Sequence, residues 1–154
     1  MRIPRAFFQY IIISFIILNL TPAFGAMVSI KYDNINLRTG PGTHYRVIYK
    51  LGAGFPLIVL KRQGNWLRVK DFENTIGWVH KDLTIHNPHM IVKANRKSKK
   101  LINIRSGPGN SHTVVGKAYY GVVFSTMEQR NGWVRVKHKT GLKGWVERSL
   151  LWGF

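Results

Sequence analysis

The stretch that decides the fold is Ile35-Asn-Leu-Arg-Thr-Gly-Pro-Gly42, because it returns 67 residues later as Ile102-Asn-Ile-Arg-Ser-Gly-Pro-Gly109. The same offset pairs Trp66-Leu-Arg-Val-Lys70 with Trp133-Val-Arg-Val-Lys137, and Gly77-Trp-Val79 with Gly144-Trp-Val146. Between residues 35–83 and 102–150, 17 of 49 aligned positions are identical without a gap. Clustered identity at a single offset indicates one module written twice.

Each module reads as β structure. Phe55–Leu60, Trp66–Lys70 and Trp133–Lys137 are short runs of β-forming residues bounded by Gly, Pro or Asn, and no helical period continues for more than a few residues. Each repeat has about 60 residues, which is near the lower limit for a domain that folds alone. We therefore expect an all-β chain whose two modules depend on each other.

The repeated motifs resemble those of the bacterial SH3-like domain, a small five-stranded barrel common in exported envelope proteins. Both copies carry the Asn-Leu/Ile-Arg-x-Gly-Pro-Gly, Trp-x-Arg-Val and Gly-Trp-Val blocks, and the whole arrangement is similar to small exported proteins of alphaproteobacteria. The resemblance implies two tandem five-stranded barrels without catalytic activity. The expected division is a signal peptide at 1–25, a first domain at 26–84, a linker at 85–89 and a second domain at 90–154.

The N-terminal segment has the features of an export signal. Arg2 and Arg5 precede the apolar run Phe7–Leu20, and small residues follow, so we expect cleavage after Gly25. This places the mature chain in the periplasm or outside the cell. An uncleaved membrane anchor over residues 6–26 is the alternative, because 21 uncharged residues are long enough to span a bilayer.

The charge is strongly positive. The chain has 24 Lys and Arg against 6 Asp and Glu, a formal net charge of +18, and +16 remains without residues 1–25. Basic residues are densest between residues 93 and 100, where they are Lys93, Arg96, Lys97, Lys99 and Lys100. This run is either a solubilising loop or a binding surface for an anionic envelope polymer. Nucleic acid fits the charge, but the export signal argues against it. The absence of Cys excludes disulfides and thiolate chemistry.

The candidate ligand-binding residues come from side-chain alternation along the Trp-x-Arg-Val strands. Leu67 and Val69 face one side, whereas the other side carries Trp66, Arg68 and Lys70, and in the second copy Trp133, Arg135 and Lys137. Each stripe is either a lid over the barrel or a binding surface, and both interpretations stay open. Trp78 and Trp145 are expected to be structural.

Analogy with eukaryotic SH3 domains extends this candidate surface. The resemblance places His80 and Leu83, with Glu147 and Leu150 in the second copy, opposite the Trp. It also adds the early-loop residues His44 and Tyr45, and Ser111 and His112 in the second copy.

The remaining motifs favour binding over chemistry. None of the six acidic residues is kept at the equivalent position of the other copy, and Asp71 and Glu73 are expected in a solvated hairpin tip. His86 and His89 are read as part of a polar linker that Pro88 stiffens, with no cofactor and no metal. The Gly-Pro-Gly segments are expected to be tight turns, with glycines free to take positive φ, rather than phosphate loops. The sequence predicts a non-catalytic module that binds peptidoglycan or an envelope protein; the alternative is a protein–protein adaptor to a wall hydrolase or a host target.

Overall fold

The computed structural model describes residues 25–154. The expected signal peptide therefore lies outside the described residues, apart from Gly25. Within the described part of the chain, no helix is long and apolar enough to cross a membrane.

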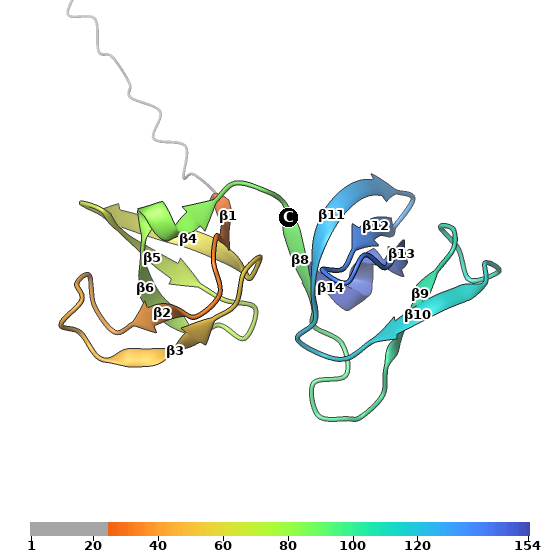
Figure 1. The fold of residues 1–154 in the computed structure, drawn as a ribbon, viewed down its shortest axis with the longest axis horizontal. Helices are drawn as coiled ribbons and strands as arrows, with labels where there is room; N and C mark the ends of the chain where they lie inside the picture. The colour runs from red at the N-terminus through yellow and green to blue at the C-terminus, as the bar shows by residue number, and fades with distance from the viewer. Residues whose placement is uncertain (1–24) are drawn as a thin grey trace, which may run out of the picture.

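The first module is one antiparallel sheet with the strand order β3-β2-β6-β5-β4-β1-β7 (Figure 1). A single 3-10 turn, η1 (Lys81–Leu83), precedes its last strand. Its strands are β1 (Met27–Ile30), β2 (Ile35–Arg38), β3 (Val47–Leu51), β4 (Pro56–Gln63), β5 (Trp66–Lys70), β6 (Ile76–His80) and β7 (Thr84–Ile85).

The second module repeats this topology, in the order β10-β9-β13-β12-β11-β8-β14. It has its own 3-10 turn, η2 (Arg148–Leu150). Its strands are β8 (His89–Val92), β9 (Ile102–Arg105), β10 (Val114–Ala118), β11 (Val123–Arg130), β12 (Trp133–Lys137), β13 (Lys143–Glu147) and β14 (Leu151–Gly153). Register shifts occur at Val59/Lys61 in one module and at Thr126/Glu128 in the other, which are equivalent positions.

The expected all-β fold with two tandem SH3-like modules is confirmed. Each sheet has seven strands instead of five, because the β2–β3 hairpin adds two strands and joins the sheet at the single pair Arg38↔Trp78. The domain boundaries stay a prediction, although β7 ends at Ile85 and β8 begins at His89.

Each module has a separate apolar core. The alternation expected along β5 and β12 is present, with the apolar residues buried and the Trp, Arg and Lys residues more exposed. The first core contains Val28, Ile30, Leu37, Leu51, Leu57, Leu67, Val69 and Val79, and the second Met90, Val92, Ile102, Ile104, Ala118, Phe124, Val134, Val136, Val146 and Leu151.

The Gly-Pro-Gly turns differ from the expectation. Of their four glycines only Gly109 has a φ in the left-handed region, at 149°. A Cβ on Gly40 would lie 2.4 Å from the Tyr45 ring, and one on Gly107 would lie 2.5 Å from the His112 ring. Glycine is therefore required there because an aromatic ring packs directly on the backbone.

Aromatic side chains dock the two modules. The Phe72 ring, just after β5, lies 5.3 Å from the ring of Tyr120 and 6.4 Å from that of Trp152, measured between centroids. The Tyr120 hydroxyl donates a hydrogen bond to Glu73, and Arg96 Nε lies 2.9 Å from the same carboxylate oxygen. Arg96 of the basic run is therefore paired with the first module.

The junction between β7 and β8 is also held to the first module. Ser29 on β1 is fully buried, and its hydroxyl donates to the carbonyl oxygen of Asn87 over 2.8 Å. His89 Nδ1 lies 3.1 Å from the same hydroxyl and 3.0 Å from the same carbonyl. The Thr126 amide of the second module donates to Pro88. The junction thus contacts both modules, as the expectation of a stiffened linker requires.

Candidate ligand-binding groove

A groove of about 300 Å³ opens on the first module beside Trp66. Trp66 and His80 are directly paired between β5 and β6, and their rings meet edge to face with centroids 5.4 Å apart. Leu83 of η1 lies in the same groove. The full lining is Asn34, Ile35, Asn36, Arg38, Thr43, Trp66, His80 and Leu83. Trp66, His80 and Leu83, which the sequence placed on one surface, are thus brought together.

Arg38, from the Asn-Leu-Arg motif, orders one wall of this groove. Its Nη1 donates to the carbonyl oxygens of Thr43 at 2.8 Å and Tyr45 at 2.9 Å, which fixes the loop after the Gly-Pro-Gly turn. Arg105 makes the equivalent hydrogen bond to the carbonyl of His112 at 2.9 Å. The repeated arginine therefore has a structural role that the sequence interpretation missed.

Asn36 contributes an unpaired hydrogen-bond acceptor to the groove lining. Its Oδ1 is buried and has no hydrogen-bond partner among the described residues. Buried polar atoms are paired in most structures, so this acceptor is an exception among the described residues.

The basic members of the first stripe lie away from the groove. Arg68 pairs across the sheet with Trp78, and Lys70 pairs with Ile76. Lys61 Nζ lies 5.4 Å from the Trp78 ring centroid, and Trp78 is only 8% exposed. A Trp covered in this way by cationic side chains stabilises the sheet surface, as expected of Trp78.

The early-loop residues form a separate aromatic pair. The rings of His44 and Tyr45 lie 4.2 Å apart, and both residues are exposed in the loop between β2 and β3. Neither belongs to the groove lining, although Tyr45 offers its carbonyl to Arg38.

The second stripe has different surroundings. Trp133 is paired with Glu147, so a carboxylate takes the place of the His80 imidazole. Arg135 is paired with Trp145, which is 7% exposed. Lys137 diverges most, because it lines a cavity between the two modules. The two stripes are therefore not equivalent sites.

Asp71 corrects the expectation of a solvated hairpin tip, because it is only 3% exposed. Its carboxylate accepts hydrogen bonds from the Tyr49 hydroxyl and from the amides of Glu73 and Thr75, the latter two at 2.8 Å. Burial, together with the hydrogen bond to Asp71, raises the pKa of Tyr49 above its usual value. The Tyr49–Asp71 pair holds the hairpin between β5 and β6 to β3.

The described residues contain no cluster of three His, Cys, Asp or Glu side chains able to hold a metal ion.

Comparison with known proteins agrees with this architecture. Residues 33–84 and residues 98–153 each match a family model described as a bacterial SH3 domain. YrvJ of Bacillus subtilis, named as an N-acetylmuramoyl-L-alanine amidase, is 28% identical over 83% of this chain and 26% of its own length. LytH of Staphylococcus aureus, named as a cell wall amidase, is 34% identical over 69% of this chain and 37% of its own.

Among solved structures, NlpC2 of Trichomonas vaginalis matches with a TM-score of 0.36 and 13% identity, over 83% of this chain and 48% of that one. The chain spans between about a quarter and just over a third of the length of the two amidase relatives. The chain belongs to the bacterial SH3 domain family and carries two such domains in tandem.

Proposed function

We propose that this chain is a non-catalytic binding module of the cell wall, located in the periplasm or outside the cell. Its ligand is peptidoglycan or a protein attached to it. The family supports a binding role, and two relatives are named as amidases, one of them as a cell wall amidase. Within this chain, the supporting observation is the groove at Trp66.

The groove combines the contacts that a polar wall ligand requires. Trp66 and Leu83 offer apolar surface, His80 an imidazole edge, and Arg38 a fixed positive charge. A large aromatic side chain beside a few fixed polar groups is typical of ligand sites. The net charge of +16 on residues 26–154 adds long-range attraction to a wall that carries carboxylates.

Cosedimentation of residues 26–154 with purified peptidoglycan sacculi, in salt from 0.05 to 1 M, tests this proposal. Attraction by exposed charge fades as the Debye length falls from about 10 Å at 0.1 M to about 3 Å at 1 M, whereas a groove with aromatic contacts keeps its ligand. We expect retention at high salt. Loss of binding at physiological salt would show that charge alone held the protein.

Single substitutions then test the groove itself. Trp66→Ala should weaken sacculus binding by about 10- to 30-fold, as removal of a central aromatic contact does. Tyr119→Ala is the matched control, because this exposed aromatic lies in the second module outside the groove. Equal affinities of the two folded variants would refute the assignment. Binding to the protein fraction released by wall digestion, but not to protein-free sacculi, would identify the adaptor alternative.

A further inference from the structure

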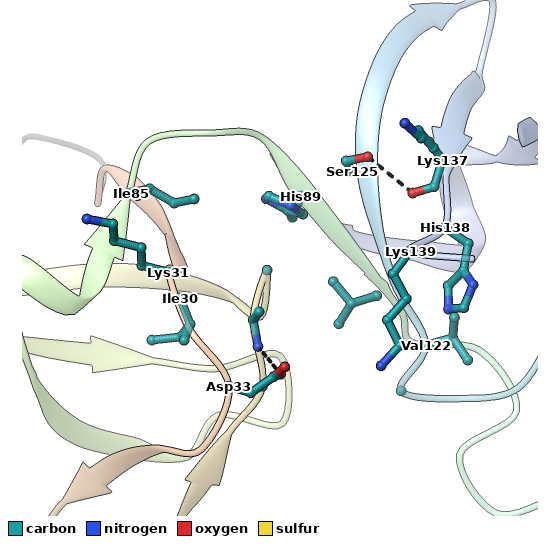
Figure 2. A pocket seen from close by; sticks show the side chains of 15 residues that line it. Ile30, Lys31, Asp33, Ile85, His89, Val122, Ser125, Lys137, His138 and Lys139 are labelled. Atoms are coloured by element: carbon teal, nitrogen blue, oxygen red, sulfur yellow. Dashed lines mark hydrogen bonds between the residues drawn. The ribbon is translucent and has the colours of Figure 1, made fainter. Parts of the chain in front are cut away.

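A second cavity of about 620 Å³ lies between the modules, about twice the volume of the groove. Figure 2 shows it opening between β1 of the first module and the segment around β11 and β12 of the second. Residues from both modules and from the junction line it: Ile30, Lys31, Asp33, Gly52, Ala53, Gly54, Ile85, His89, Gly121, Val122, Val123, Ser125, Lys137, His138 and Lys139. We call it the inter-module cleft.

The docking contacts give this cleft a defined shape. The aromatic contacts of Phe72 and the hydrogen bonds of Ser29 hold the modules and their junction together. Its walls include two turns, Gly52–Gly54 on one side and Gly121–Val123 on the other. His89, held at Nδ1, lies between the modules in Figure 2.

The cleft has an excess of positive charge. Lys31, Lys137 and Lys139 line it, and none of them forms an ion pair among the residues that the structure describes. Its one carboxylate, Asp33, accepts a hydrogen bond from the Ala53 amide at 2.8 Å and so caps the neighbouring turn. Unpaired cations in the walls of a concave surface raise the concentration of anions there.

At two positions that line the cleft, the second copy carries basic residues where the first copy has none. Lys139 occupies the position of Phe72, and His138 occupies the position of the buried Asp71. The hairpin that docks the modules in the first copy therefore presents cationic and imidazole groups to the cleft in the second. Figure 2 shows the Lys139 side chain extending into the space between the modules.

We propose that the inter-module cleft is a second binding site, separate from the groove, for an anionic group of the cell wall, either a carboxylate or a phosphate. Lys139, whose side chain extends into the cleft, binds this group, and Lys31 and Lys137 add positive charge to the walls. The volume is within the range of ligand pockets, about 300–1,000 Å³. The proposal rests on the proposed function, because that function supplies the polymer carrying the anion.

The test compares two double variants that lose the same charge. Lys137→Gln/Lys139→Gln removes two cleft lysines, and Lys50→Gln/Lys117→Gln removes two exposed lysines on β3 and β10 outside it. At 0.15 M salt we expect the cleft variant to bind sacculi about 10-fold more weakly and the control within about 2-fold of the unchanged protein. Equal weakening would overturn the proposal in favour of general attraction by charge.

Amide chemical shifts locate the bound group. Muropeptides released from sacculi, or inorganic phosphate, should shift the amide signals of Gly52–Gly54 and Gly121–Val123, and Lys137→Gln/Lys139→Gln should abolish the shifts. Absence of shifts with both probes would overturn the cleft. Stripping phosphate polymers from sacculi with acid distinguishes the sources: lost binding identifies phosphate, and retained binding identifies carboxylates.

Trp66→Ala, measured in parallel, separates this proposal from the groove. Weakening by the cleft variant but not by Trp66→Ala refutes the groove and supports the cleft. Weakening by Trp66→Ala but not by the cleft variant refutes only the cleft.

Discussion

Replacing Phe72 by Ala should uncouple the two modules. Truncation of a fully buried Phe costs about 3–5 kcal/mol, and the half-burial of Phe72 reduces the expected loss in unfolding free energy to about 2–3 kcal/mol. Part of this loss is the two ring contacts across the interface, to Tyr120 and Trp152, each contributing about 0.5–1.5 kcal/mol. Because each module has its own apolar core, we expect the variant to unfold in two separated steps once the contacts between the modules are weakened.

Urea unfolding monitored by Trp fluorescence measures this effect, since Trp152 reports directly on the interface. Lys139→Ala, at the equivalent position of the second module, is the control and should change stability by less than about 0.5 kcal/mol. A double-mutant cycle of Phe72→Ala with Tyr120→Ala should give a coupling of about 1 kcal/mol. If Phe72→Ala behaved like Lys139→Ala, or the cycle gave no coupling, the interface would not hold the modules together.

Three further perturbations test individual contacts. Partial burial and the hydrogen bond to Glu73 raise the pKa of Tyr120 to about 12, above its unfolded value near 10. The stability that this contact contributes should therefore be retained below pH 10 and lost as the pH rises through 12. Absorbance at 295 nm follows the ionisation, and titration of Tyr120 near 10 would contradict the contact. Asp71→Ala leaves three donors without their acceptor and should cost about 3 kcal/mol in thermal unfolding, where a loss below about 1 kcal/mol would show that the carboxylate is dispensable. Arg38→Ala should speed amide exchange in the loop after Gly42, whereas Arg46→Ala, an exposed change in the same loop, should not. Equal amide exchange rates in the two variants would show that the hydrogen bonds of Arg38 do not fix this loop.

The repeat made the fold predictable. Identities at one offset covered the Trp-x-Arg-Val and Gly-Trp-Val blocks, and these blocks form β5, β6, β12 and β13 in the structure. The grouping of Trp66 with His80 followed from family resemblance, and it holds because the two residues are direct neighbours in register.

The contacts between modules were not predictable from the same reasoning. Phe72 is Lys139 in the other copy, and Tyr120 is Ala53, so a search for identities passes over both. The sequence did offer one indication of these contacts, namely positions that are aromatic in one copy and not in the other. The burial of Asp71 was missed for a related reason: its partner Tyr49 is 22 residues away on β3 and is replaced by Gly116 in the second copy.

The unequal hairpins make the interface between the two modules asymmetric. The first module presents Phe72 to the module that follows it, but the corresponding corner of the second module carries Lys139, a charged side chain that cannot take its place in an aromatic contact. Lys139 instead lines the cleft between the modules together with Ala53, the counterpart of Tyr120, so the aromatic contact closes one side of the interface and the cleft opens on the other.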